Sequence, residues 1–266
     1  MSPVSRQIVE QLKRIEEEED VRILYACESG SRAWGFPSKD SDYDVRFIYI
    51  RPVEWYLSIF EKRDVIERPI SDKLDINGWD LKKALRLFLK SNPPLLEWLQ
   101  SPIPYMENGP VAGLIRGIAP RAFSPSSCMH HYLHMAKGNY REYLQGERVK
   151  IKKYFYVLRP ILACAWIETY GGMPPIEFLT LVDALVPNGS ELKGVILDLL
   201  ARKMAGDELD YEPRIERINE FLEEKLAYYE RAVLGIKPGM GGQEHRLDEL
   251  FREALQVTWG TSRTGG

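Results

Sequence analysis

The stretch GSRAWGFPSKDSDYDVRFIYI, residues 30–50, joins a Gly-Ser pair and a polar loop to an apolar run typical of a strand. Asp42 and Asp44 stand at the start of that run. Aspartate is a poor strand former, and a carboxylate in low dielectric is costly unless something pairs with it. Two interpretations follow: an acidic turn that precedes the strand, or a site for a cation.

The composition is that of an ordinary folded protein. The chain has 266 residues, of which 44% are hydrophobic and 28% charged, enough for one large domain or two smaller ones. The formal net charge is −3. This argues only weakly against a nucleic-acid partner, because a local basic groove is enough to bind one.

Cysteine spacing and apolar segments bear on the cellular compartment. The three cysteines, Cys27, Cys128 and Cys164, form no CxxC pair, so we expect neither a structural zinc site nor a disulfide framework. The N-terminal residues lack the apolar core of a signal peptide, and no apolar run approaches the roughly 18 residues that a membrane span needs. We therefore expect a soluble, cytoplasmic protein without a membrane partner.

Two regions of different periodicity follow each other along the chain. The first mixes strands, predicted at 21–27, 43–50, 64–70 and 73–78, with helices, predicted at 3–18 and 80–91. After residue 108 almost only helical periodicity remains. We expect an α+β fold in two domains, a sheet-bearing domain at 1–108 and an all-helical domain at 109–266, with a disordered tail at 257–266.

The acids of this first region suit a metal site. Side chains alternate along a strand, so Asp42 and Asp44 are expected on one side. Asp75 lies on a later strand candidate, between apolar neighbours that would face the core. Close carboxylates repel unless a cation lies between them, and Mg²⁺ takes carboxylate and phosphate oxygens. The pattern indicates a two-ion site for Mg²⁺ or Mn²⁺ at these three aspartates, and the acidic turn is the alternative.

Gly30, Ser31 and Arg32 suit a phosphate site above these acids. A glycine lets the backbone approach a phosphate closely, and successive N–H groups and a serine hydroxyl can donate to it. The guanidinium of Arg32 could add a bidentate phosphate contact.

Several strings of the sequence resemble a known family. They are GSRAWGFPSKDSDYDVRFIYIRP (30–52), LDINGWDLKKALRLFLKSNPPLLEWLQSP (74–102) and KKYFYVLRPILACAWI (152–167). With the Gly-Ser pair, the Asp-x-Asp strand and the later Asp75, the chain resembles the DNA polymerase β-like nucleotidyltransferase superfamily. More narrowly, it resembles the predicted RNA-repair-pathway nucleotidyltransferase family, of the RlaP or YcgL type. The likeness runs from about residue 21 to at least residue 178.

The resemblance implies a polymerase-β-like palm, a mixed sheet with flanking helices, followed by an all-helical domain. It also implies transfer of a nucleoside monophosphate from a nucleoside triphosphate to a hydroxyl, with release of pyrophosphate. Gly30 and Ser31 would bind the triphosphate. Asp42 and Asp44 would hold the metal ions, and Asp75 would complete the second ion site and help deprotonate the acceptor.

A later helix candidate adds further expected nucleotide contacts. Lys152, Tyr156 and Arg159 share one face if residues 149–170 form a helix. In the superfamily it resembles, a Lys or Tyr commonly contacts the nucleotide from this position. The alternative is an amphipathic helix whose long cations only cover apolar surface.

The acceptor is left open by the sequence. An RNA end, with tRNA among the candidates, is the leading hypothesis, in an RNA repair or modification role. Nucleotidylation of a protein or a small molecule is the second, favoured mildly by the lack of basic charge. A non-catalytic module that only binds nucleotide is the third. The sequence does not define the oligomeric state.

Overall fold

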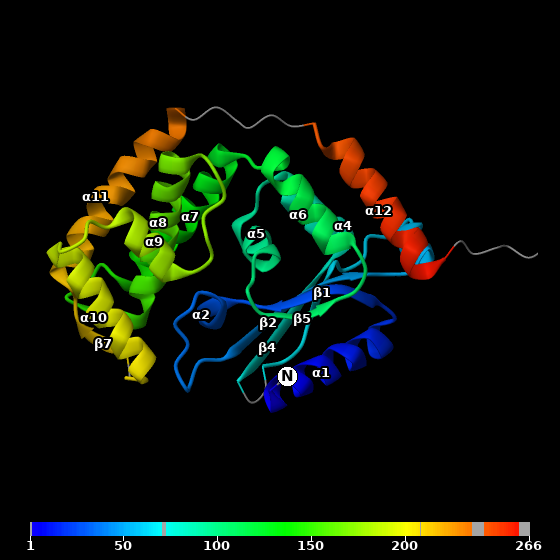
Figure 1. The fold of residues 1–266 in the computed structure, drawn as a ribbon, viewed down its shortest axis with the longest axis horizontal. Coiled ribbons are helices and arrows are strands. Elements are labelled where there is room, and N and C mark those ends of the chain that lie inside the picture. The colour runs from blue at the N-terminus through cyan, green and yellow to red at the C-terminus, as the bar shows by residue number, and fades with distance from the viewer. Residues whose placement is uncertain (1, 71–72, 208, 236–241, 261–266) are drawn as a thin grey trace, which may run out of the picture.

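The computed structural model describes residues 2–70, 73–207, 209–235 and 242–260. In this part of the chain a five-stranded sheet with flanking helices adjoins a helical region (Figure 1). The strands of the sheet are β1 (Arg22–Glu28), β2 (Tyr43–Ile50), β3 (Val65–Glu67), β4 (Leu74–Asp80) and β5 (Pro104–Glu107). The expected α+β class with a helical C-terminal part is confirmed.

Helices occupy most of the remaining described chain. They are α1 (Pro3–Glu19), α2 (Gly30–Ala33), α3 (Val53–Tyr56), α4 (Leu81–Leu89), α5 (Pro93–Leu99), α6 (Val111–Ala122), α7 (Pro125–Tyr143), α8 (Tyr154–Tyr170), α9 (Phe178–Leu185), α10 (Glu191–Ala205), α11 (Glu216–Ala232) and α12 (Glu244–Trp259). Two 3₁₀ turns, Ile151–Lys153 and Val233–Gly235, and a strand pair, β6 (Arg148–Lys150) with β7 (Tyr211–Pro213), complete the list.

The sheet is mixed, with the order β3-β4-β2-β1-β5. β2 and β4 run parallel, and the other three pairs are antiparallel. β2 matches its predicted range. β3 is shorter than the predicted strand 64–70, in keeping with Pro69, which has no N–H to give to a ladder; residues 71–72 lie outside the described residues.

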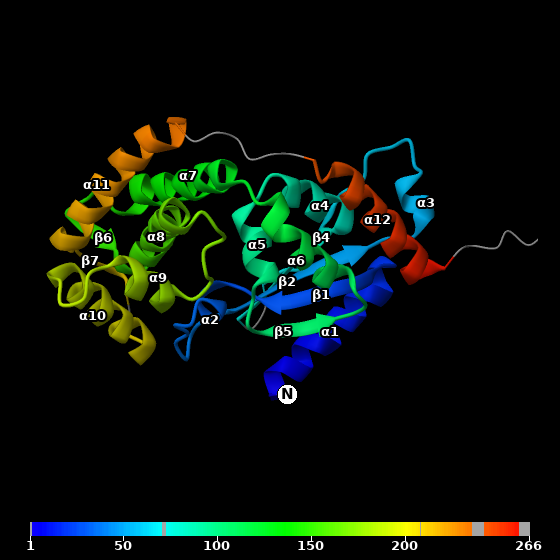
Figure 2. The ribbon, with the colours of Figure 1, turned by 45° about the horizontal axis from the view of Figure 1, so that its top comes forward.

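The two faces of the sheet carry different cores. Val45, Phe47 and Ile76 pack with α1 on one face, and Ile48 and Ile50 join α4–α8 in the larger core on the other. Figure 2 shows α1 on one side of the sheet and α4, α5 and α6 on the opposite side. Alternation along β2 explains this division, since odd-numbered and even-numbered residues of the strand face opposite ways.

Helices from both ends of the later chain pack beside the sheet. α6 contacts β1, and α12 contacts α4. The ring of Phe251 on α12 meets Tyr56 edge-on, with ring centroids 5.0 Å apart. The domain division at residue 108 stays a prediction, and these two helices, which it assigns to the helical domain, lie against the sheet-bearing part.

Two local predictions are wrong. α8 begins at Tyr154 rather than near residue 149, because Arg148–Lys150 pair with β7 and the next three residues form a 3₁₀ turn. Disorder from residue 257 is also wrong for 257–259, since α12 continues to Trp259. Residues 261–266 lie outside the described residues. Among the described helices, none combines the length and apolarity required to traverse a bilayer.

Gly78 on β4 is required by the packing of Phe47, its partner on β2. A Cβ at Gly78 would lie 2.2 Å from the Phe47 ring, which is fully buried. We expect Gly78→Ala to lower the free energy of unfolding by about 1–3 kcal/mol, the usual range for overpacking a core. Chemical denaturation with circular dichroism measures this.

Gly138→Ala is the matched control for Gly78→Ala. Gly138 lies within α7, and a Cβ there would have no neighbour within 4 Å. Alanine should therefore stabilise the helix by about 0.4–1 kcal/mol. Equal stability of the Gly78→Ala variant and the wild type would contradict the packing of Phe47 against this glycine.

Candidate active site

Asp44 and Asp75 are neighbours across the parallel pair of strands. The register of β2 and β4 places Asp44 opposite Asp75 and Arg46 opposite Asn77. Because side chains alternate, Asp44 and Arg46 share the face of β2 that, further along, carries Ile48 and Ile50 into the larger core. This face of β2 is polar where the strand begins and apolar where it ends. The two carboxylates therefore lie at the edge of the larger core.

Arg46 lies between the two carboxylates. Its Nη2 is 3.1 Å from Oδ1 of Asp44 and 2.7 Å from Oδ2 of Asp75. Its Nη1 also donates to the backbone carbonyl of Asp75 at 3.0 Å. The guanidinium therefore offsets part of the repulsion between the two carboxylates and links β2 to β4 near the N-terminal ends of these strands.

Asp42 does not lie on the strand, contrary to the expectation. β2 begins at Tyr43, and Asp42 is exposed in the loop before it. No group of three His, Cys, Asp or Glu side chains among the described residues is arranged to hold a metal ion. At Asp44 and Asp75 the cation between the carboxylates is the guanidinium of Arg46.

The chemistry of these donors suits a hard divalent cation, although the described residues form no three-ligand cluster. Three carboxylates stand within two short segments, and oxygen is the ligand that Mg²⁺ prefers. Burial, followed by repulsion from Asp75 and Asp42, raises the pKa of the Asp44 carboxyl, while Arg46 opposes the rise. A raised pKa marks a carboxylate whose charge is incompletely compensated, as expected where a further cation would be favourable.

Gly30 packs directly against Asp44. Its φ is +59°, and a Cβ at this position would lie 2.0 Å from Oδ2 of Asp44. Only glycine combines this backbone conformation with such a close approach. Gly30 opens α2, and Ser31 and Arg32 follow in the first turn, where N–H groups have no acceptor within a helix. The predicted Gly-Ser element therefore lies beside the acids.

Glu28 fixes the start of β2 from β1. Its side chain is fully buried, accepts the backbone N–H of Asp44 at 2.8 Å and accepts the hydroxyl of Tyr105. Burial raises the pKa of Glu28, and these hydrogen bonds limit the rise. Glu28 thus acts on the site through the position of Asp44.

Arg32 holds the loop that carries Asp42. Its Nε donates to the carbonyl of Asp42 at 3.1 Å and its Nη2 to that of Ser41 at 2.8 Å. The guanidinium also stacks on Tyr43, 3.7 Å from the ring centroid. Its contact with a phosphate stays a prediction, because the structure uses these donors on the loop.

A lysine groove lies on the Asp42 side of the site. It has a volume of about 560 Å³, and its lining includes Lys150, Lys152, Lys203, Ser38 and Asp40. Nζ of Lys203 is 3.3 Å from the hydroxyl of Ser38. Burial and the charge of Lys152 lower the pKa of Lys203, and Asp42 and Asp40 oppose this effect. The groove therefore brings three lysines near the loop of Asp42, and the carboxylates of Asp40, Asp207 and Asp210 in the same lining balance their charge.

Tyr156 and Arg159 have different surroundings, although one helix carries both. Tyr156 is 42% exposed, and burial together with the charges of Asp44 and Asp42 raises its pKa. Arg159 is 2% exposed and pairs with Glu97 at 2.6 Å. Tyr156 thus lies within electrostatic reach of Asp44 and Asp42, whereas Lys152 lines the lysine groove. Arg159 stays in the interior, where desolvation is offset by its carboxylate partner.

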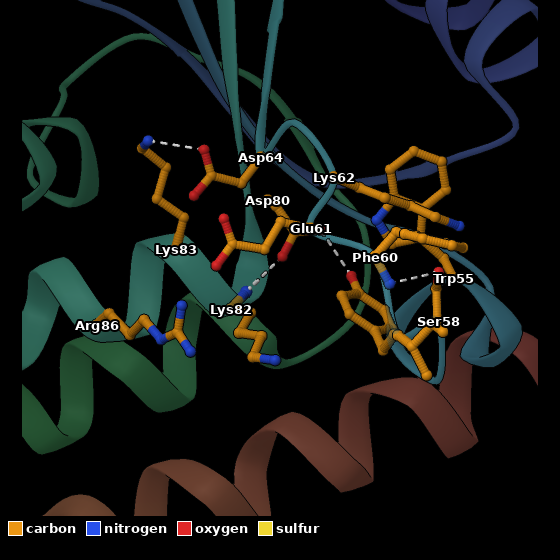
Figure 3. Close-up of a pocket in the computed structure, with 12 residues that line it drawn as sticks. Trp55, Ser58, Phe60, Glu61, Lys62, Asp64, Asp80, Lys82, Lys83 and Arg86 are labelled. Atoms are coloured by element: carbon orange, nitrogen blue, oxygen red, sulfur yellow. Dashed lines mark hydrogen bonds and ion pairs between the residues drawn. The ribbon is translucent and has the colours of Figure 1, made fainter.

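A separate hollow lies at the other end of the parallel strands (Figure 3). It has a volume of about 460 Å³ and includes Tyr56, Asp64, Asp80 and Lys83 in its lining. Its buried acid, Asp80, caps α4 by accepting the N–H of Lys82 at 2.8 Å, and it accepts the Tyr56 hydroxyl at 2.7 Å. This acid is used by the fold, and the predicted site residues are absent from the lining.

The sequence interpretation missed Arg46 and Lys203. Arg46 is two residues after Asp44, so strand alternation alone could have placed it beside the acids. Lys203 lies in the last turn of α10, far along the chain, and no local pattern points to it.

Comparison with known proteins decides the family. The profile described as the RNA repair pathway DNA polymerase beta family matches residues 4–253. The chain belongs to this family. It is 51% identical over 256 residues to the "Uncharacterized protein YcgL" of Bacillus subtilis (strain 168), covering 96% of this chain and 98% of that protein. The family predicted from the sequence is confirmed.

Among solved structures, a nucleotidyltransferase-like protein from Exiguobacterium sibiricum 255-15 aligns with 93% of this chain and 89% of its own. The identity is 12% and the TM-score 0.29, which are too low to indicate a shared fold. Membership of the RNA repair pathway DNA polymerase beta family itself supports a nucleotidyltransferase, with RNA repair as the setting of the family.

For this family member, Gly30→Ala tests the contact between the Gly-Ser turn and Asp44. The new Cβ would displace the Asp44 carboxylate and strain a left-handed backbone, so we expect the free energy of unfolding to fall by roughly 1–3 kcal/mol. Thermal melting measures the loss. Gly35→Ala is the matched control: its φ is +89°, and its Cβ would lie 4.0 Å from the nearest atom, on Glu177.

Both glycine variants carry the backbone strain, so only the steric contact separates them. We expect the double variant Gly30→Ala, Asp44→Ala to regain part of the stability that Gly30→Ala alone loses, because the second substitution removes the clashing carboxylate. Equal losses in Gly30→Ala and Gly35→Ala, with no recovery, would contradict the close contact.

Arg46→Met tests the role of the guanidinium as counter-ion. Without it, Asp44 and Asp75 repel each other, so we expect the unfolding free energy near neutral pH to fall by roughly 1–3 kcal/mol in the absence of metal. Added Mg²⁺ or Mn²⁺ should raise the melting temperature of this variant more than that of the wild type. Differential scanning fluorimetry over a metal titration measures both effects.

Arg252→Met is the control for Arg46→Met. Arg252 is exposed and pairs with Asp248 within α12, so its loss should cost less than about 1 kcal/mol and leave the metal response unchanged. An identical metal response in Arg46→Met and wild type would show that Arg46 does not occupy the place of a cation.

Proposed function

We propose that this protein transfers a nucleoside monophosphate from a nucleoside triphosphate to a hydroxyl at an RNA end and releases pyrophosphate. One observation carries the proposal: Asp44 and Asp75 face each other across parallel strands while Gly30 packs on Asp44. In a chain of this family, such an arrangement suits phosphoryl chemistry, which depends mainly on positioning and on charge stabilisation.

The triphosphate is assigned to the Gly-Ser turn and the lysine groove. Ser31 offers a hydroxyl and a first-turn N–H, and Lys152 and Lys203 offer positive charge within one groove. The lowered pKa of Lys203 reflects burial and a neighbouring cation. An anionic phosphate would offset the repulsion between the two ammonium groups and favour the charged form of Lys203, so phosphate binding at this lysine is electrostatically favourable.

The carboxylates are assigned to the reacting end of the nucleotide. Asp42, Asp44 and Asp75 would hold divalent cations, which when bound supply charge for the phosphoryl oxygens and polarise the acceptor hydroxyl. Asp75 accepts the proton of that hydroxyl. Arg46 donates to its Oδ2, so Oδ1 is the oxygen we assign to the proton.

The transfer needs no reactant besides the triphosphate and the acceptor hydroxyl. The acceptor oxygen forms a bond to the α-phosphorus, and the bond between that phosphorus and the oxygen bridging to the β-phosphate breaks. Pyrophosphate leaves with the electron pair, and the proton of the acceptor passes to Asp75.

The contact between Arg46 and the two carboxylates favours one alternative. An arginine that permanently neutralises Asp44 and Asp75 would suit a protein that binds triphosphate without transferring it. Release of pyrophosphate separates the two functions. Transfer to a protein or small-molecule hydroxyl, the other alternative, would use the same carboxylates and differ in the labelled product.

Asp44→Asn is the central test of transfer. Incubation with each α-labelled nucleoside triphosphate, Mg²⁺ or Mn²⁺ and fractionated cellular RNA should label a defined RNA in the wild type. The variant should lose roughly 10³-fold or more of this activity, and Asp42→Asn and Asp75→Asn should also lose activity. Label found only on protein, or undiminished labelling by Asp44→Asn, would refute transfer to RNA.

Stability measurements separate a chemical effect from misfolding. The pKa of Asp44 is raised in the folded protein, so its ionised form destabilises the native state as the pH rises through that pKa. Asp44→Asn should therefore melt no lower than the wild type near neutral pH without metal. Asp198→Asn, at an exposed position of α10, is the control and should keep full activity.

A further inference from the structure

A second groove adjoins Asp75 and shares no lining residue with the lysine groove. It has a volume of about 480 Å³, within the usual range for small-ligand sites. We call it the tryptophan groove and define it by Trp34, Trp79, Trp98, Pro94, Met135 and Asn77. Asp75 and Arg46 also line it, so the groove opens directly onto the candidate active site.

The alternation of β4 builds the floor of this groove. Leu74 and Ile76 pack with α1, so Asp75, Asn77 and Trp79 face the other way. One strand therefore presents, in order, a carboxylate, an amide and an indole. The spacing of about 6–7 Å between such alternate residues suits a nucleoside whose hydroxyl meets the acid and whose base meets the indole.

Trp79 is held from behind by α5. Its ring centroid lies 3.9 Å from that of Trp98, at an interplanar angle of 34°. Trp98 is 4% exposed, whereas Trp79 is half-buried. Trp34 is fixed separately, with its Nε1 donating to Glu97 at 3.4 Å. Buried partners thus orient the indoles, and a preorganised aromatic wall binds a flat ring at low entropic cost.

The polar end of the groove suits the edge of a base. Asn77 donates through its side-chain amide to Glu67 at 3.1 Å. That bond orients the amide and leaves the carbonyl oxygen of Asn77 as an acceptor for an amino group. The lining also contains the carboxylates of Glu67, Glu97 and Asp75, which disfavour an anionic group inside the groove. Aromatic walls with these polar groups therefore match a neutral planar heterocycle better than an aliphatic or an anionic ligand.

The position of the groove indicates which nucleoside it takes. The phosphates of the incoming nucleotide belong to the lysine groove, beside Asp42. The tryptophan groove lies at Asp75, the residue assigned to the acceptor proton. We propose that the tryptophan groove holds the base of the terminal nucleoside of a single-stranded RNA acceptor, an inference that rests on the nucleotidyl transfer proposed above.

The surface beyond the groove fits a polymer. Ser127, His131 and Met135 are spaced by four residues, so they follow one face of α7. Lys90 joins Ser127 and His131 in lining a further hollow of about 350 Å³. A strand whose last base lies against Met135 can therefore continue along α7 to a lysine that attracts its phosphates.

Binding of a fluorescent single-stranded oligo-adenylate, followed by anisotropy without metal or triphosphate, tests the groove independently of catalysis. Trp79→Leu should weaken binding on the order of 5- to 150-fold, the range for loss of one stacked base. Met135→Ala should weaken it less, and it disturbs the fold little because Met135 is 39% exposed. Met204→Ala, at a 48% exposed methionine of α10, is the matched control and should bind as the wild type does.

A probe whose terminal residue lacks its base identifies the occupant. The wild type should bind this abasic probe as weakly as Trp79→Leu binds the intact one, and Trp79→Leu should not discriminate between the two probes. Equal affinity of folded Trp79→Leu, Met135→Ala and wild type for the intact probe would overturn the proposal. So would equal discrimination against the abasic probe by wild type and Trp79→Leu.

The readouts distinguish failure of this proposal from failure of the proposed function. If no acceptor is labelled by the wild type, transfer fails, while the binding cycle still decides the groove. If RNA is labelled, Trp79→Leu should raise KM for RNA and leave KM for the triphosphate unchanged. If Trp79→Leu raises only the KM for the triphosphate, the groove binds the triphosphate and the inference is overturned. The inference is also overturned if Trp79→Leu abolishes transfer to a protein acceptor and leaves transfer to RNA unchanged.

Discussion

The parallel pairing of β2 and β4 is the constraint on which the site depends. It brings Asp44 and Asp75 together in register, although thirty residues of chain separate them. Two carboxylates held this close need a counter-ion, and Arg46 supplies it from the same strand face. The backbone pairing thus holds two mutually repelling carboxylates together. A cation that competes with the guanidinium for these carboxylates should therefore bind favourably at this site.

The position of the site follows from the way β2 changes character along its length. The face that carries Asp44 and Arg46 at its start carries Ile48 and Ile50 at its end. The polar half cannot be covered by the helices that pack on the apolar half, because unpaired charges are costly to bury. The sheet therefore leaves its acids at an open margin, with lysines on the Asp42 side and indoles on the Asp75 side.

Much of this site was predictable because its signals are local. The strand 43–50, the glycine before it and the acids all lie within a short stretch whose alternation and turn residues have direct physical meanings. Arg46 was also within reach of that reasoning. The expectation that Asp42 shares a strand face with Asp44 was wrong, since the ladder begins at Tyr43, whose backbone N–H donates to the carbonyl of Lys73.

The sequence by itself determined the α+β class, the family and the acids with their glycine, because these depend on periodicity, on motif spacing and on backbone preference. Only the tertiary structure decided which distant groups meet them. Lys203 reaches the loop of Asp42 from the end of α10. Arg159, expected at the nucleotide, pairs with Glu97 in the interior. Such contacts are set by how helices pack, and side-chain burial in a core has no signature at a single sequence position.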